Sequence, residues 1–567
     1  MHHVLTITEI IRSIFGFLDV RSNARNARVS KIWSSIALDR VWEDVEPDVF
    51  RSLCPMSQSE TNLTFVRPPL LSDWMTFLTY SSRVRTWSDS SWSSPYNLSQ
   101  KARNDIAMSR PLTSVFPNLL RLCTGTQDLD PFLMGTSVKI LDLVVRHIPL
   151  KNVAEVRTTW VFRNVTERLP HLTSLYLSYL DDDTPNYDEQ IVGLLRNLTK
   201  LQKLSLPIMC LNADIAFTLA SHQDLRTVTF ELGMPIVFYA CSQETRVMFD
   251  STQPLPNAAF SALHTVEFSA SNLADAASFL FQPEFPLRNI RVMSIHIRHV
   301  PLSGDTGIFL SRLTTDCPTL QKLTLAFHAL KYDGNDPLPT IPYFELQHLS
   351  IVSQLQNLTT LVIRHPHPIN MDDNDVAKLA KSCPRLQTIH LNPYPVVPTR
   401  PGTTLLALQH LANHCPDLRS VGIYLDGTVA PAPIPTLPRR IRGTLILGHS
   451  PISVDLETLD DNSRIARYLA DVLCKPCQWG WEDTNFVAKV INREEWLSRM
   501  TIYHDLDGHK RSWKMVAVML KMILEDRDKM QRSVLEALGG ELSAWKGKCA
   551  ALDAENVRLR ASPNGAQ

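Results

Sequence analysis

A short phrase of alternating apolar and polar residues, of the form L-x-x-L-x-L, returns along most of the chain. The alternation over its last positions predicts a short strand with one buried face, and its first apolar residue anchors the turn into that strand. The phrases, in which another apolar residue can replace leucine, occupy residues 138–143, 172–177, 201–206, 225–230, 263–268, 290–295, 320–325, 358–363, 386–391 and 418–423.

Capped helical segments lie between the phrases, for example at residues 212–222, 372–382 and 403–414. A strand and a helix in each repeat predict an α/β solenoid of irregular leucine-rich-repeat type over residues 116–510, in which each repeat buries its apolar face against its neighbours. The spacing of roughly 24 to 38 residues overlaps the range of such repeats.

Further local patterns complete this repeat region. Cysteine followed by proline precedes the first leucine of a phrase at Cys317, Cys383 and Cys415, which favours buried structural thiols over reactive ones. After the last phrase, residues 441–447 are expected to add a final strand and residues 462–473 a helix.

Two apolar stripes at helical spacing open the chain, and Trp42 lies on a short third segment. Three small helices over residues 1–45 are near the smallest size that can bury a hydrophobic core alone. The module is therefore expected to pack against a neighbouring domain or a partner protein. The stripes consist of Ile7, Ile10, Ile11, Ile14 and Leu18, then Val29, Ile32, Trp33 and Ile36.

Residues 46–115 are predicted to link this module to the repeats. Four prolines make residues 46–70 irregular, and an amphipathic helix follows over residues 71–84. At the other end of the chain, residues 511–562 are helical and charged.

The C-terminal helix carries apolar residues in alternating steps of three and four, which is the seam of a coiled coil with an asparagine at one core position. Weak self-association through residues 535–559 is one interpretation. A fraying tail helix is the other, because Gly539 and Gly540 each cost about 1 kcal/mol in a helix. The seam comprises Leu535, Leu538, Leu542, Trp545, Cys549, Leu552, Asn556 and Leu559.

The composition bears on the binding partners and the cellular localisation of the chain. Lysine plus arginine and aspartate plus glutamate both number 57, so no net field favours nucleic acid. No apolar run approaches the roughly eighteen residues of a membrane helix, so no membrane association is expected. With no signal-peptide pattern and with scattered cysteines, we expect a cytoplasmic or nuclear protein.

Catalytic chemistry is not indicated, since the sequence lacks phosphate-binding, nucleophile-elbow and metallopeptidase motifs. The best metal candidate joins Cys474 and Cys477 with His504 and His509, but its spacing is about twice that of a typical zinc finger. The sequence therefore predicts a non-catalytic chain without cofactor or metal.

The N-terminal module resembles an F-box. The match runs through Ile7, Glu9-Ile10-Ile11, Ile14-Phe15, Phe17-Leu18, Ala24, Ala27-Arg28-Val29, Lys31, Trp33, Ala37 and Trp42. Thr8 replaces the usual proline, Ser30 replaces a frequent cysteine, and Asn23 replaces an apolar residue. A second resemblance, to the helix that follows the F-box in fungal F-box proteins with leucine-rich repeats, rests on Trp74, Phe77, Tyr80 and Arg83-Val84-Arg85.

The resemblance implies a substrate-recognition adaptor of an SCF-type ubiquitin ligase, in which the F-box docks on a Skp-family linker, and through it on a cullin-based ligase, while the repeats bind an unknown target protein. The docking residues it implies are Ile7, Glu9, Ile10, Ile14, Phe15, Leu18, Val29, Lys31 and Trp33. Target binding is expected on the concave face, at Tyr176, His296, Arg298, His328, Arg364, His390 and Tyr424. The alternative is a leucine-rich-repeat scaffold, outside any ligase, whose N-terminal helices only cap the solenoid.

Overall fold

The computed structural model describes residues 7–89, 96–111, 114–145, 151–179, 187–231, 254–327, 342–395, 399–432, 441–452, 459–473 and 506–561. Contacts divide the chain into two compact units, Met1–Ala326 and Phe327–Gln567.

A three-helix module begins the first unit, with α1 (Thr8–Gly16), α2 (Val20–Asn26) and α3 (Lys31–Glu43). It has a small core of its own made of Ile11, Phe15, Ile36 and Ala37, and the ring of Trp33 meets Phe15 edge-on at 5.4 Å. The module thus has three helices, but they are not the three that were predicted, because the second stripe and Trp42 share α3 and α2 was predicted from neither stripe.

Polar residues define the ends of these helices. The Asp19 carboxylate accepts from the backbone N–H of Ser22 and caps α2, and the Ser30 hydroxyl accepts from the backbone N–H of Trp33 and caps α3. Asn23 is buried and donates to the main-chain oxygens of Phe15, in the last turn of α1, and of Leu18, in the turn that follows. Two of the positions that depart from the F-box pattern, Ser30 and Asn23, thus hold the turns of the module.

The segment between the module and the repeats is more ordered than its prolines predict. A small sheet in the order β2-β3-β5 and two helices pack around buried aromatic rings, among them Phe50, Phe77, Trp87 and Phe116. Pro47 begins a 3₁₀ turn, where its missing N–H is tolerated. The elements are β1 (Asp44–Val45), η2 (Pro47–Ser52), β2 (Met56–Ser59), β3 (Asn62–Phe65), α4 (Leu71–Ser81), β4 (Thr86–Ser88), β5 (Asn97–Leu98) and α5 (Gln100–Ser109).

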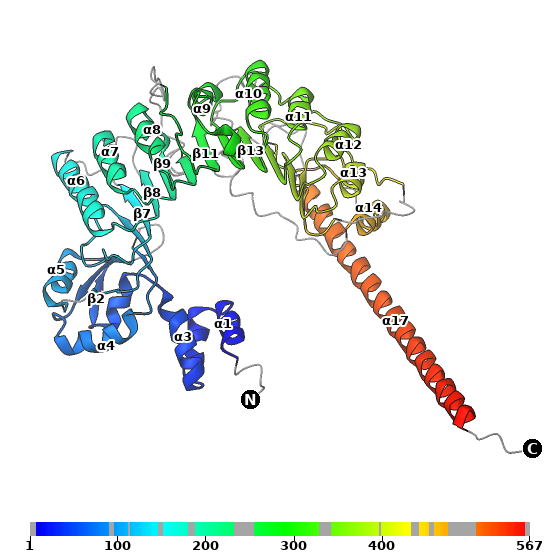
Figure 1. Cartoon of the computed structure of the whole chain (residues 1–567), viewed down its shortest axis with the longest axis horizontal. Coiled ribbons are helices and arrows are strands. Elements are labelled where there is room, and N and C mark those ends of the chain that lie inside the picture. Colours follow the sequence, from blue (N-terminus) through cyan, green and yellow to red (C-terminus); the bar gives the residue numbers. More distant parts are fainter. Residues whose placement is uncertain are drawn as a thin grey trace, which may run out of the picture. The chain divides into compact units, whose positions relative to one another are not determined.

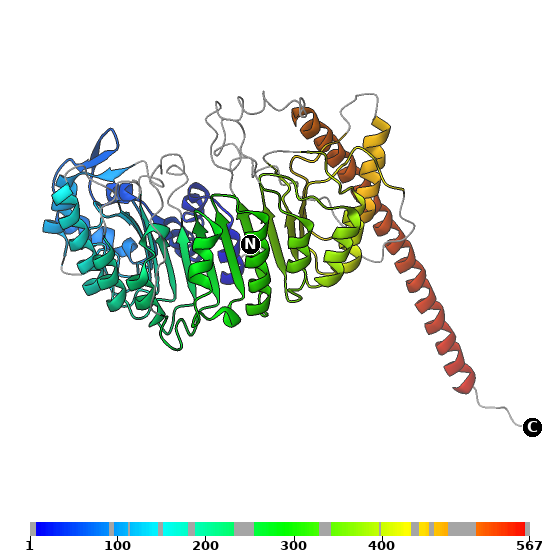
Figure 2. The ribbon, with the colours of Figure 1, turned by 90° about the horizontal axis from the view of Figure 1, so that it is seen from above.

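The rest of the first unit repeats strand and helix. Its parallel sheet runs in the order β1-β4-β6-β7-β8-β9-β10-β11-β12-β13, and helices α6 to α10 lie along one face of the strands (Figures 1 and 2). The elements are β6 (Arg121–Gly125), β7 (Ile140–Val145), α6 (Lys151–Arg168), β8 (Ser174–Tyr179), α7 (Asp188–Asn197), β9 (Lys203–Pro207), η3 (Ile208–Cys210), α8 (Ala213–Ala220), β10 (Thr227–Glu231), β11 (Thr265–Ala270), α9 (Leu273–Leu280), η5 (Leu287–Asn289), β12 (Val292–Ile297), α10 (Ser303–Asp316) and β13 (Lys322–Phe327).

The apolar positions of the phrases form buried rows across this sheet. Leu141, Leu175, Leu204, Val228 and Val266 are paired in register from β7 to β11, and all are buried. Each repeat therefore completes the core of the next, as expected of a solenoid.

The second unit continues the same alternation. Its sheet runs in the order β14-β15-β16-β17, and α17 packs on α14 after the repeats. The elements are α11 (Leu346–Val352), β14 (Thr360–Arg364), α12 (Asp373–Ser382), β15 (Thr388–Leu391), α13 (Leu406–His414), β16 (Ser420–Ile423), β17 (Thr444–Ile446), α14 (Leu459–Val472) and α17 (Leu506–Ala561). Every phrase of the sequence, from residues 138–143 to 418–423, thus contains a strand, and the final strand predicted within 441–447 is β17.

The cysteines that precede the phrases are buried, as predicted. The thiol of Cys383 lies 3.8 Å from the oxygens of Ser353 and Leu355, and that of Cys415 lies 3.6 Å from the oxygen of Cys383. Burial raises the pKa of Cys383 to about 11 and that of Cys415 to about 12. These thiols are neutral donors that tie neighbouring repeats together.

The long helix α17 is anchored only through its first part. Trp513, Val516, Leu520 and Leu524 are buried, and Arg527 donates to the oxygen of Ala470 at 2.7 Å at the C-terminal end of α14. The second half of α17 runs clear of α14 (Figure 1). Among the described residues, no helix is long and apolar enough to cross a membrane.

Candidate protein-binding surfaces

The sheet face opposite helices α6 to α10, called the open sheet face from here on, carries the polar positions of the strands in the first unit. Alternation places Leu175 and Leu177 in the core and Tyr176 on the other face. Register then sets Asp142, Tyr176 and Ser205 side by side across β7, β8 and β9. The same row continues through Thr229 in β10, Glu267 in β11 and Ser294 in β12.

Carboxylates on this face form ion pairs and hydrogen bonds with neighbouring side chains. The Glu267 carboxylate lies 3.7 Å from Nε2 of His296, which also lies 2.9 Å from the Ser294 hydroxyl. The Ser205 hydroxyl donates to Glu231 at 3.0 Å. Burial and the charge of Glu231 raise the pKa of Glu267. The face therefore offers paired acids and hydrogen-bonding side chains held by rigid strands.

The predicted concave residues of the first unit fall on or next to this face. Tyr176 lies in β8 and His296 in β12, and both are half-buried. Arg298 follows β12 and its backbone N–H donates to the oxygen of Ala270. Sequence periodicity placed these residues because their phrase positions alternate with buried leucines.

The predicted concave residues of the second unit differ in their exposure. Arg364 ends β14 and is half-buried, and His390 in β15 lies 2.9 Å from the Ser420 hydroxyl. Tyr424 is buried instead of exposed, and its hydroxyl donates to the oxygen of Thr399 at 2.8 Å. The chain has left β16 at this residue, so strand alternation no longer predicts its direction. His328 lies outside the described residues.

The predicted docking residues of the N-terminal module also divide by burial. Phe15 lies in the module's own core, so it supports the surface from beneath instead of forming it. Ile7, Ile10 and Trp33 are half-buried. The exposed members of the predicted set are Glu9, Ile14, Leu18, Val29 and Lys31.

Further exposed apolar side chains lie in the same module and were not selected from the sequence. Phe17 after α1 is 89% exposed, Val20 at the start of α2 is 61% exposed, and Ile32 in α3 is exposed as well. The helical stripe did not single out these two residues: Phe17 lies at its edge, three residues after Ile14, and Val20 lies off its apolar face. Together with Ile14, Leu18 and Val29, they leave apolar side chains at both turns of a very small module.

Helix α3 joins the module to the rest of the first unit. Trp42 at the end of α3 stacks on Tyr80 of α4 at 5.3 Å, and Arg83 forms an ion pair with Asp39. Val45 in β1 pairs with Trp87 in β4. The module therefore packs on α4 through α3, whereas α1 packs in the module's own core.

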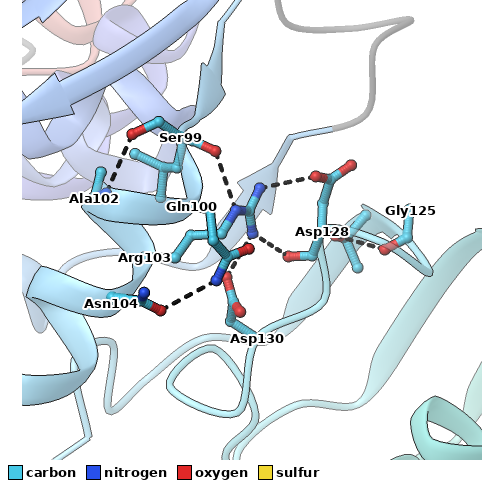
Figure 3. A network of polar contacts seen from close by, with 10 residues as sticks. Ser99, Gln100, Ala102, Arg103, Asn104, Gly125, Asp128 and Asp130 are labelled. Atoms are coloured by element: carbon cyan, nitrogen blue, oxygen red, sulfur yellow. Dashed lines mark hydrogen bonds and ion pairs between the residues drawn. The ribbon is translucent and has the colours of Figure 1, made fainter. Parts of the chain in front are cut away.

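A buried charge cluster in the first unit ties the connecting segment to the first repeats (Figure 3). Arg103 of α5 is nearly buried and pairs with the carboxylates of Asp128 and Asp130, while its Nε donates to the oxygen of Leu98 at 3.1 Å. Figure 3 shows the guanidinium of Arg103 pointing into the loop that follows β6. Each of the three side-chain nitrogens of Arg103 has a partner, so the cluster has a structural role.

Asp89 is buried near this cluster. Desolvation raises its pKa to about 7, and Thr124 and Trp87 oppose that shift. Among the described residues, no donor meets either carboxylate oxygen in full hydrogen-bond geometry. Asp89 occupies the last position of the phrase Val84-x-x-Trp87-x-Asp89, where other repeats have an apolar residue.

The metal candidate is not assembled in the part of the chain that the structure describes. Cys474, Cys477 and His504 lie outside the described residues, and Nδ1 of His509 lies 2.7 Å from the main-chain oxygen of Ile452. No group of three metal-binding side chains occurs among the described residues.

Comparisons with known proteins give a distant structural likeness alone. No family model matches the chain, and no curated protein matches it. One solved structure that it resembles is the crystal structure of a TLR13–ssRNA13 complex, with a TM-score of 0.29 and 16% sequence identity, over 61% of this chain and 41% of that chain. The leucine-rich-repeat-like fold therefore rests on the parallel strands and alternating helices of the chain itself.

Proposed function

We propose that this chain is the substrate-recognition adaptor of an SCF-type ubiquitin ligase. In this proposal α1 to α3 dock on a Skp-family linker, and the open sheet face holds the protein to be ubiquitylated. The ligase chemistry belongs to the partners. The adaptor acts by proximity, because a held target presents its lysines to a charged ubiquitin carrier at raised effective concentration.

The exposure of Phe17 is the observation that carries this proposal. A phenylalanine that is 89% exposed removes no apolar area from water in the free chain, although the module around it has a complete core. Exposed apolar side chains collected on one small module mark an interaction site more often than scattered single residues do. The fit of the exposed residues Ile14, Leu18 and Val29 to the F-box pattern supports a Skp-family linker as the partner.

The test is the affinity of the full-length chain for a purified Skp-family linker, measured by calorimetry. Phe17→Asp and Val20→Asp each place a charge at an exposed apolar position and are expected to weaken binding by at least tenfold, or about 1.4 kcal/mol. Met108→Asp is the matched control, because Met108 in α5 is 88% exposed and lies outside the module. Failure of the unaltered chain to bind the linker would remove the proposal.

The contacts of α3 favour a second candidate, a scaffold in which the module only caps the repeats. Its support is the Trp42–Tyr80 stack and the pairing of β1 with β4 at the edge of the sheet. Deletion of residues 1–43, which removes α3 together with the Trp42–Tyr80 stack, separates the two functions. Capping predicts a large drop in the thermal stability of the repeats, whereas docking predicts loss of linker binding with the stability of the repeats retained.

A further inference from the structure

The second half of α17 is a helix without a packing partner among the described residues. C-terminal to Arg527, every side chain of α17 whose burial is described is exposed. These include Trp545, which is 69% exposed, and Leu552, which is 59% exposed. An isolated helix of this kind in water gains little stability from propensity alone, so large apolar side chains along it call for a partner.

The sequence of this segment fits a heptad repeat. With Cys549 at position a, the positions a and d fall on one seam and include the exposed residues Trp545 and Leu552. Gly540 and Gly547 both fall at position f, away from the seam, and a Cβ added at either would meet no atom within 4 Å. These glycines lower helix propensity by about 1 kcal/mol each but do not interrupt the seam. The a and d positions are Leu535, Leu538, Leu542, Trp545, Cys549, Leu552, Asn556 and Leu559.

The flanking charges identify the partner as a second copy in parallel orientation. In a parallel pair, position g of one helix faces position e of the next heptad on the other helix. In this segment each such pair joins opposite charges, and each pair occurs twice, once from either helix. The pairs are Glu541 with Lys546, Lys548 with Asp553, and Glu555 with Arg560.

An antiparallel pair of the same helices would instead bring g opposite g and e opposite e. With the seams aligned end to end, Lys548 would then face Lys548 of the other copy, Lys546 would face Lys546, and Glu541 would face Glu555. Like charges at such positions are unfavourable. Asn556 at position a adds to the preference, because a buried asparagine pair fixes the register of a parallel two-stranded coil.

We propose that residues 535–559 form a parallel, in-register coiled coil with a second copy of this chain. Each dimer would then carry two N-terminal modules and two open sheet faces, so a partner with two binding sites would gain avidity. The proposal uses only the C-terminal helix and does not depend on the ligase assignment.

The test is the mass of the full-length chain in solution over a dilution series, by sedimentation. We expect a dimer. Leu552→Asp changes a d position and should weaken self-association by at least tenfold, whereas Ala551→Asp, at the neighbouring c position, should leave it unchanged. Lys548→Glu sets a glutamate against Asp553 of the other copy and should weaken the dimer, and Lys548→Glu combined with Asp553→Lys should restore it.

Oxidation of Cys549 tests the relative orientation of the two helices. In a parallel, in-register coil the two Cys549 thiols face each other, so mild oxidation should link the copies covalently, and Cys549→Ser should abolish the link. A monomer at every concentration, or a dimer that Leu552→Asp leaves intact, would overturn the proposal. A dimer that depends on Leu552 but fails to cross-link through Cys549 would overturn its parallel register.

Discussion

Asn23 donates from its side-chain amide to the main-chain oxygen of Phe15 at 3.0 Å, within the small N-terminal module. The same amide reaches the oxygen of Leu18 at 3.2 Å. Asparagine therefore stands at a usually apolar position because its amide gives a further buried donor to the oxygen of Phe15, in the last turn of α1, and a donor to the oxygen of Leu18, in the turn that follows. The departure from the F-box pattern has a structural reason.

Replacing this amide should destabilise the module. Asn23→Ala removes two side-chain hydrogen bonds, to the oxygens of Phe15 and Leu18, each of which is expected to contribute about 0.5–1.5 kcal/mol. Hydrogen exchange of the amides in α1 and α2 measures the loss locally. Asn26→Ala in the same helix is the control and should have little effect. Equal exchange in the two variants would contradict the assigned role of Asn23.

Asp89 should make the first unit less stable as the pH rises. Its pKa is raised from 3.8 to about 7 by burial, so the folded state holds a proton between about pH 4 and 7 that the unfolded state has lost. The stabilising contribution of the protonated carboxyl is complete below the unfolded pKa and disappears as the pH passes about 7.

Asp89→Asn, which stays neutral, should therefore be more stable than the unaltered chain at pH 8, by at most about 4 kcal/mol. The difference should shrink towards pH 4.5. Urea unfolding followed by exchange in β4 and β6 measures it. A difference of the same size at both pH values would show that the Asp89 carboxyl is not titrating on folding.

His365 should have the opposite effect in the second unit. Burial, with the neighbouring His367 and His348, lowers its pKa from 6.5 to about 4. Nδ1 of the neutral ring accepts from the backbone N–H of His367 at 3.0 Å. The stability that His365 contributes is complete above about pH 6.5 and is lost as the pH falls towards 4.

Hydrogen exchange in β14 and β15 should therefore accelerate between pH 7 and pH 5, after correction for the intrinsic pH dependence of exchange. In His365→Asn, whose side-chain oxygen can accept the same hydrogen bond, this extra acceleration should vanish. If the variant keeps it, another group controls the stability of this region.

Tyr176 tests the open sheet face. Tyr176→Ala removes a half-buried ring from the middle of the row between Asp142 and Ser205 and should reduce target binding. His171→Ala is the control, because His171 is exposed and precedes β8. Mass spectrometry of proteins captured while degradation is blocked should show targets that His171→Ala keeps and Tyr176→Ala loses. Identical sets would place target binding elsewhere.

The strands could be predicted wherever the apolar alternation is complete. Leu172, Leu175 and Leu177 of one phrase all lie in the core, and the same holds in the other repeats. The strands β4 and β6 were missed because their phrases end in a polar residue, Asp89 just after β4 and Thr124 within β6. Both side chains are nevertheless buried in the position that leucine takes elsewhere. A polar residue at a core position hides a repeat from pattern analysis.

The candidate surfaces could be predicted less fully. Alternation placed Tyr176 and His296 on the open face, because each lies within a strand. It misplaced Tyr424, which follows a strand and turns inward to reach Thr399. Phe17 was not selected as a docking residue, since periodicity separates core from solvent and carries no information on which exposed side chains a partner covers.

The central claim is that the N-terminal module docks on a Skp-family linker. The most direct measurement is the hydrogen-exchange footprint of that linker on the full-length chain. We predict slower exchange in α1, α2 and the first turns of α3, around the exposed Phe17, with β2 and β3 unchanged. A footprint confined to the repeats, or no footprint at all, would contradict the account.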